Sequence, residues 1–142
     1  MAGTGRKFTV SLVTPDGPAY EGDAEMVIVP GADGEIGVLA RHAPLIATLK
    51  AGSTRIHTEE GADVLEFATG PGFFQVLQDR AIALVDDAVN AQEIDDARAT
   101  EQLEAARAEL EAIERGESTA DRWQIEQRIR HAENQLSVVG RG

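Results

Sequence analysis

The chain has 142 residues, of which 25 are acidic and 13 basic, and its formal net charge is −12. Phosphate binding needs clustered Lys and Arg, so this acidic excess argues against a nucleic-acid partner. The chain has no cysteine, which excludes a disulfide scaffold, a thiol nucleophile and a cysteine-ligated metal centre. No run approaches the roughly 18–20 apolar residues of a membrane span, so we expect no direct membrane insertion.

The composition changes after Val89, which predicts two structural modules. Residues 1–89 hold all five prolines, 11 of the 14 glycines and five of the six aromatic residues, whereas residues 90–142 hold no proline. Proline and glycine interrupt helices and mark the turns between strands. We therefore predict a β-domain over residues 1–89 and a helical domain over residues 90–142.

The first module is predicted to be a series of short strands. Pro- and Gly-rich segments such as 14–18 and 31–34 have the composition of turns. No helical pattern lies between the apolar runs, so crossover helices for a parallel sheet are missing. The runs therefore indicate an antiparallel sandwich or barrel of eight or nine strands. The predicted strands are 8–13, 25–30, 36–39, 45–49, 54–57, 64–68, 73–77 and 81–85.

The second module is predicted to be an antiparallel helical hairpin. Asn90 followed by Glu93 indicates a helix start, Gly116 a helix stop, and Ser118 followed by Asp121 a second start. Small and apolar residues follow at helical spacing, and they are Ile94, Ala97, Leu103, Ala106, Leu110, Ile113, then Ile125, Ile129, Ala132, Leu136 and Val139. Because these stripes are narrow, we expect the hairpin to be stabilised by only a few kcal/mol and to detach readily.

The sequence offers little support for an enzyme or a metal site. No pair of histidines and no His–carboxylate cluster has metal-ligating spacing, and no GxSxG motif occurs. His42 is expected to be an ordered turn residue, and an enzyme built on it would lack a nearby acid–base partner. His57 and His131 are expected on the solvated surface, and the adjacent pair Asp86-Asp87 to be a chance product of the acidic composition. Trp123 is expected to anchor helix packing.

Several segments together form a recognisable series, and they are Phe8–Pro18, Tyr20–Gly22, Val29–Leu39, His42–Leu45, Lys50–Gly52, Phe67–Phe74 and Ala83–Asp86. These segments resemble the epsilon subunit family of bacterial F-type ATP synthase. Their order and spacing agree with the family, and the predicted hairpin follows where the family has one. The resemblance implies a β-sandwich of about ten antiparallel strands followed by a two-helix hairpin. It also implies a non-catalytic rotor subunit of F1Fo ATP synthase.

The family resemblance assigns contacts to the sandwich. It implies that the sandwich lies between the gamma subunit and the c-ring and takes part in proton-driven ATP synthesis. By similarity the loop Gly34–Gly37, with Glu35 at its tip, faces the c-ring, and His42, Ala43 and Pro44 lie near the gamma contact. The chain departs from the family at Ala40-Arg41, where Pro-Gly is common. The resemblance further implies a peripheral location on the cytoplasmic side of the bacterial cell membrane, as part of F1.

For the hairpin, the resemblance implies regulation of ATP hydrolysis. The hairpin either folds on the sandwich or extends along gamma into the alpha and beta subunits, where it inhibits hydrolysis. We expect arginines of the hairpin to make the inhibitory contact with acidic surfaces of those subunits, and the candidates are Arg107, Arg115, Arg122, Arg128 and Arg130.

An ATP-sensing module remains the alternative function. Residues Ile94-Asp95-Asp-Ala-Arg98-Ala99 match the nucleotide motif of ATP-binding relatives. Arg98 is suited to phosphate and Asp95 to a base amine or ribose, although the same residues suit an ordinary helix N-terminus. Further arginines of those relatives align with Ala105, His131 and Gln135, so we expect at most weak binding of ATP as a regulatory ligand and no other cofactor. Co-purification with gamma and the c-ring would separate the two functions.

Overall fold

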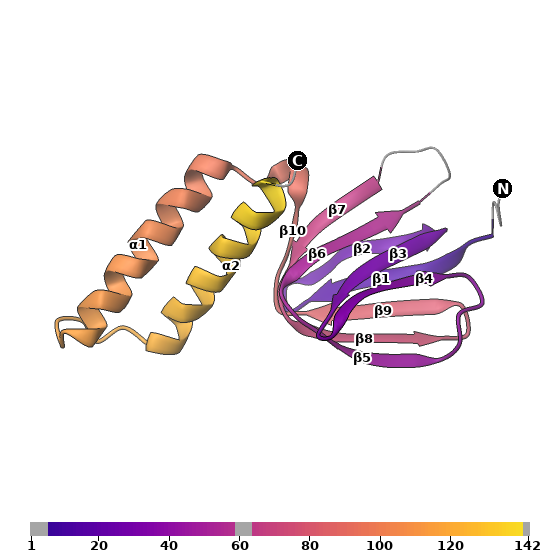
Figure 1. Ribbon diagram of the computed structural model, residues 1–142, viewed down its shortest axis with the longest axis horizontal. Helices are drawn as coiled ribbons and strands as arrows, with labels where there is room; N and C mark the ends of the chain where they lie inside the picture. The colour runs from indigo at the N-terminus through magenta and orange to yellow at the C-terminus, as the bar shows by residue number, and fades with distance from the viewer. Residues whose placement is uncertain (1–5, 59–63, 141–142) are drawn as a thin grey trace.

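The computed structural model describes residues 6–58 and 64–140, which form a ten-stranded β-sandwich followed by two helices (Figure 1). The strands are β1 (Phe8–Thr14), β2 (Gly17–Ala24), β3 (Met26–Gly31), β4 (Gly34–Leu39), β5 (Leu45–Leu49), β6 (Gly52–His57), β7 (Val64–Thr69), β8 (Gly72–Leu77), β9 (Arg80–Val85) and β10 (Ala88–Asn90). A short 3-10 turn, η1 (Ala91–Glu93), leads to α1 (Asp96–Glu114) and α2 (Arg122–Gly140).

The strands form two layers that are joined at one corner. β10, β7, β6, β3 and β4 make the first layer, and β5, β8, β9, β1 and β2 make the second. The layers meet where Gly31 of β3 pairs with Leu49 of β5. The core between them is apolar, and its largest fully buried side chains include Leu12, Ile56 and Phe74. This arrangement confirms the predicted sandwich.

The pairing differs from the sequence prediction at one ladder. β1 and β9 run parallel, with Val10 opposite Ala81 and Leu12 opposite Ala83. The antiparallel prediction rested on the absence of a crossover helix between the strands. The connection exists without a helix because the chain from β1 to β9 passes through β2 to β8, and these strands themselves make the crossover.

Two strands and both helix starts also differ from the prediction. β2 was missed because Gly17–Ala24 is polar and contains Pro18, and β10 because it has only three residues. Asn90 caps η1 through its contact with the Gln92 amide, and α1 begins only after Asp95. Asp121, not Ser118, caps α2 by accepting from the Trp123 amide at 2.9 Å.

The helices pack side by side as the predicted hairpin, which projects from one end of the sandwich (Figure 1). Gly116 ends α1 with a φ of +76°, the left-handed conformation that the prediction required. Leu103 and Ala106 of α1 and Ile125 and Ala132 of α2 are buried, so the middle of each predicted stripe forms the packed face. Toward the stripe ends Ala97 is exposed, and the buried residues are Ala99 and Val138. α2 is the helix that packs against β6 and β7.

Candidate functional site

The outer surface of β5, β8 and β9 is apolar although it faces solvent. Ile46, Phe73 and Leu84 are 77%, 62% and 52% exposed, Leu77 is exposed and Ile82 is half-buried. We call these five residues the apolar face. Large apolar side chains that gather in water mark a surface for binding another protein.

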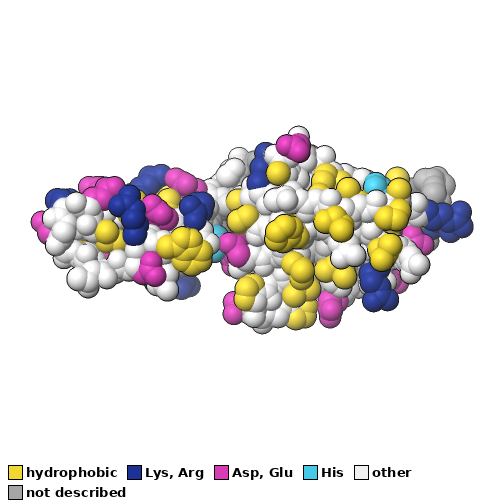
Figure 2. All heavy atoms as spheres, turned by 90° about the horizontal axis from the view of Figure 1, so that it is seen from below, with side chains coloured by type: hydrophobic (Ala, Val, Ile, Leu, Met, Phe, Trp, Pro, Cys, Tyr) yellow, Lys and Arg dark blue, Asp and Glu magenta, His cyan; other side chains and the backbone are white. Residues whose placement is uncertain are grey.

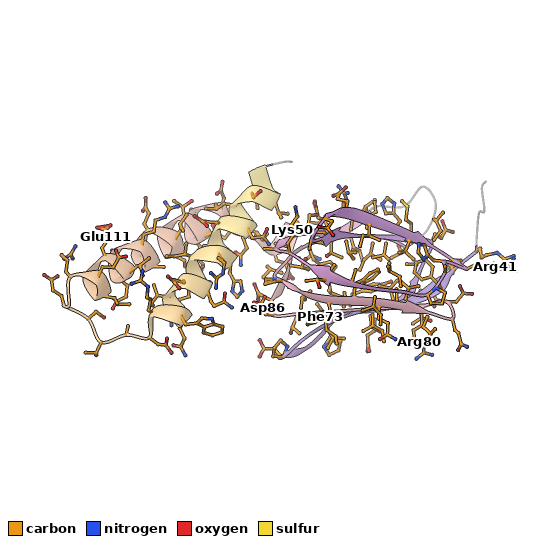
Figure 3. All side chains as sticks on the ribbon, turned by 60° about the horizontal axis from the view of Figure 1, so that its bottom comes forward. Arg41, Lys50, Phe73, Arg80, Asp86 and Glu111 are labelled. Carbon is orange, nitrogen blue, oxygen red and sulfur yellow. The ribbon has the colours of Figure 1, made fainter. Side chains whose placement is uncertain are left out.

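The strand register brings the apolar face together from three strands. Phe73 lies opposite Leu84 in the β8–β9 ladder and opposite Thr48 in the β5–β8 ladder. Side chains alternate along a strand, so Ile46 shares the face of Thr48. Figure 2 shows apolar side chains gathered over the sandwich, and in Figure 3 Phe73 points away from the interior.

The charges around the apolar face lie at its margins. Arg80 stands at one end, opposite Leu77. On the far side of β1, β2 contributes exposed Glu21 and Asp23, which pair with Ser11 and Thr9. A partner with an apolar centre and basic residues at its edge matches this surface.

The residues predicted to form a c-ring loop all lie on a strand. Gly34, Glu35 and Gly37 belong to β4, and the tip of the β3–β4 turn is Ala32-Asp33. Glu35 is therefore not at the tip, because the ladder with β3 continues to Gly31 opposite Gly34. Its carboxylate lies 2.9 Å from Nη2 of Arg55.

The predicted gamma-contact residues lie at the opposite end of β4. His42, Ala43 and Pro44 form the β4–β5 connection, and Nδ1 of His42 lies 2.7 Å from the Ala43 carbonyl oxygen. Arg41 has a φ of +65°, a conformation that favours glycine. Its amide donates to Asp79 at 2.5 Å, which ties this connection to the β8–β9 turn.

Four of the five candidate inhibitory arginines have partners within the hairpin. Arg107 pairs with Glu133 at 2.9 Å, and Arg122 pairs with Glu114 at 3.1 Å, so both pairs join α1 to α2. Arg115 pairs with Glu117, and Nε of Arg130 donates to Gln127. Arg128 is exposed and lines a groove between the helices.

The predicted nucleotide motif and this groove do not coincide. Asp95 accepts from the Arg98 amide at 3.1 Å and so caps α1, Ala99 is buried and Ile94 is half-buried. The groove has a volume of about 650 Å³ and contains none of these residues. Ala105, His131 and Gln135, which stand where the ATP-binding relatives have arginines, do line the groove. Its charged and polar lining consists of Asp87, Gln102, Glu109, Arg128, His131 and Gln135.

The junction between α2 and the sandwich is polar, and sequence reasoning missed it. Asn134 donates to the carbonyls of Gly52 and Thr69 at 3.2 and 3.0 Å. Gln127 donates to Asp86 at 3.2 Å, and His131 lies 3.4 Å from the same carboxylate. The sequence signal for this junction was the set of polar residues between the apolar positions of α2. It was not enough to predict the contacts, because the partners of Gln127 and Asn134 lie 41 and 82 residues away along the chain.

Among residues 6–58 and 64–140, no group of three or more His, Cys, Asp or Glu side chains is arranged to hold a metal ion. In the same part of the chain neither helix is apolar enough over sufficient length to cross a membrane.

Comparison with known proteins identifies the family. The family described as "ATP synthase, Delta/Epsilon chain, beta-sandwich domain" matches residues 7–91. The ATP synthase epsilon chain of Rubrobacter xylanophilus is 38% identical over 99% of this chain and 97% of its own length. The chain belongs to the ATP synthase epsilon family. Membership relates it to the rotary F1Fo complex, whose work is ATP synthesis and ion transport.

Other epsilon-family members agree along most of the chain. The epsilon chain of Halalkalibacterium halodurans is 38% identical over 93% of this chain and 96% of its own length. A chain in the cryo-EM structure of the Euglena gracilis mitochondrial ATP synthase, comprising OSCP, F1 and c-ring, has the same fold. Its TM-score is 0.71 at 23% identity, with coverage of 98% of this chain and 87% of that one.

Proposed function

We propose that the chain is a non-catalytic central-stalk subunit of F1Fo ATP synthase that links the gamma subunit to the c-ring. The apolar face carries the proposal, because its exposed Ile46 and Phe73 require a protein partner to leave water. We assign this face to gamma. The end of the sandwich at the β3–β4 turn, with Glu35 beside it, is the proposed c-ring contact. The complex holds the chain peripherally on the cytoplasmic side of the bacterial membrane.

Cysteine labelling tests the gamma assignment directly, because the chain has no cysteine of its own. We expect Ile46→Cys to react rapidly with a maleimide in the isolated chain and at least about tenfold more slowly in assembled F1Fo, because a standard interface excludes water from its centre. Val64→Cys on β7, 40% exposed and outside the apolar face, is the matched control. Equal reactivity of Ile46→Cys in both states, in a complex that contains the chain, would contradict the assignment.

We propose that the hairpin inhibits ATP hydrolysis when it leaves the sandwich and extends toward the alpha and beta subunits. Its ion pairs are exposed, and such pairs contribute only about 0–1 kcal/mol each. Separation of α1 from α2 breaks Arg107–Glu133 and Arg122–Glu114. It frees the Arg107 guanidinium and leaves Arg122 paired only with Glu126 of its own helix. Acidic surfaces of the catalytic subunits then replace the lost glutamates at little net cost.

Replacement of the five arginines by alanine tests this role, the five being Arg107, Arg115, Arg122, Arg128 and Arg130. We expect the assembled enzyme to hydrolyse ATP several-fold faster than with the wild-type chain, because each lost charged contact weakens the inhibited state. A control chain carries alanine at the exposed, uncharged Gln92, Gln102 and Gln124. Hydrolysis that stays as inhibited as with the wild-type chain would exclude the arginines as the inhibitory contact.

A further inference from the structure

A cluster of three titratable residues lies where the hairpin meets the sandwich. Asp86 and Asp87 occupy the corner between β9 and β10, and His131 lies on α2. Nε2 of His131 is 3.4 Å from Oδ1 of Asp86, and Nδ1 is 3.9 Å from Oδ2 of Asp87. Figure 3 shows Asp86 at this junction. We call these residues the junction cluster.

The geometry of the junction cluster favours a protonated imidazole. A neutral imidazole carries one ring proton, so one of its nitrogens presents a lone pair to a carboxylate oxygen. Only the imidazolium presents an N–H group to both Asp86 and Asp87. Within the described part of the chain, Nε2 of His131 and Oδ1 of Asp86 are buried and have no hydrogen-bond partner of normal length. If Nε2 carries a proton and moves slightly closer to Oδ1, it donates a hydrogen bond that satisfies both atoms.

The two carboxylates are held in place by the backbone. The Asp86 amide donates to the Pro71 carbonyl at 3.1 Å, and the Gly70 amide donates to the Asp87 carbonyl at 2.9 Å. A Cβ at Gly70 would lie 1.7 Å from Oδ1 of Asp86, so this carboxylate rests directly on the β7–β8 turn. Because the corner is fixed, the carboxylates have little freedom to turn away from a neutral His131.

Other charged groups near the junction cluster decide whether its environment favours or opposes a positive charge on His131. From α1, Glu109 lines the same groove as His131 and Asp87, and Arg128 of α2 lines it as well. Burial raises the pKa of Asp87, and the charges of Asp86 and of Asp16 in the β1–β2 turn act in the same direction. His131 and the Ala88 amide oppose this rise. The acidic groups around His131 thus outnumber the cations.

We propose that docking of the hairpin takes up a proton at the junction cluster, so that the sandwich holds the hairpin at acidic to neutral pH and releases it as pH rises. A histidine ordinarily changes charge between pH 5 and 8. Loss of its proton leaves two partly buried carboxylates facing a neutral ring. Burial raises the pKa of Asp87 in the folded chain, so its ionisation opposes folding of this corner, with no effect below the ordinary aspartate pKa and the full effect above the folded-state value.

The pH dependence can be measured on the isolated full-length chain. Spin labels on Lys50→Cys of the sandwich and Glu111→Cys of α1, both exposed and outside the cluster, report docking as a distance distribution. Uptake of one proton changes the docking constant by at most tenfold per pH unit. We expect it to fall at least about tenfold between pH 6 and pH 8. If docking stays complete, the same titration in an Asn134→Ala background, which lacks two hydrogen bonds to the sandwich, brings the equilibrium into range.

Variants at His131 separate a proton effect from simple packing. We expect His131→Gln to abolish the dependence between pH 6 and 8, and His131→Arg, which stays charged, to keep the hairpin docked at pH 8. His57→Gln, on β6 and outside the cluster, is the matched control and should titrate like the wild type. A docking constant that does not change with pH in the Asn134→Ala background, or an undiminished dependence in His131→Gln, would overturn the proposal.

The consequence for catalysis rests on the proposed function. If a released hairpin inhibits hydrolysis, inhibition of the assembled enzyme by the wild-type chain strengthens from pH 6 to pH 8, and inhibition by the His131→Arg chain does not. Docking that depends on pH without this change in hydrolysis would count against the inhibitory role alone. Docking that ignores pH would count against the junction cluster alone.

Discussion

A double replacement of Ile46 and Phe73 by aspartate is expected to weaken binding to the gamma subunit by about a hundredfold or more. Both side chains are largely exposed in the isolated chain, so their loss does not open a cavity in the core. At the centre of an interface, an anchor residue contributes about 2 kcal/mol or more, and two new carboxylates would have to be desolvated.

The measurement is the dissociation constant for purified gamma at fixed ionic strength, accompanied by circular dichroism and a melting curve of the variant. Val64→Asp introduces the same charge at an exposed apolar position on β7 and should bind like the wild type. A variant that keeps its fold and still binds gamma with the wild-type constant would show that the apolar face is not the gamma contact.

The sandwich was predictable because its strands carry their signal locally. Leu12, Val27, Val29 and Ile56 alternate with more exposed residues, and each strand is bounded by turn residues. β2 carries no such signal, since its neighbours in β1 supply the burial and Gly17–Ala24 supplies mainly backbone hydrogen bonds. The parallel β1–β9 ladder was unpredictable for the same reason: it joins segments about seventy residues apart, and nothing in either segment encodes the other.

The candidate sites divide in the same way. Two of the three outward residues of β8, Phe73 and Leu77, are as apolar as the inward ones, so Phe73 was visible as a strand residue but not as an exposed one. His131 and Asp86 were each expected to be solvated, because neither has a partner near it in sequence. Folding places them 3.4 Å apart, and only the packing of α2 against the β9–β10 corner produces that contact. Pairs of this kind require tertiary structure to be found.

Substitution of Gly72 by alanine is expected to destabilise the sandwich by about 4 kcal/mol or more, an exceptional loss for one methyl group. A Cβ at this position would lie 1.8 Å from the carbonyl oxygen of Leu84 and 2.8 Å from Cα of Val85. These are backbone atoms of the paired strand, so no side-chain rotation relieves the clash. β8 and β9 must separate, and Phe74 and Val85, which are part of the core, move with them.

Urea unfolding followed by circular dichroism measures this effect, and a total stability of about 5–15 kcal/mol makes a loss of that size visible as partial or complete unfolding. Gly37→Ala on β4 is the control, because no atom beyond its own chain neighbours lies within 4 Å of the added Cβ. The control should stay within about 1 kcal/mol of the wild type, since alanine mainly lowers the entropy of the unfolded chain there. If Gly72→Ala were equally stable, β8 and β9 could separate locally at low cost, and the apolar face that they carry would be a flexible surface instead of a fixed one.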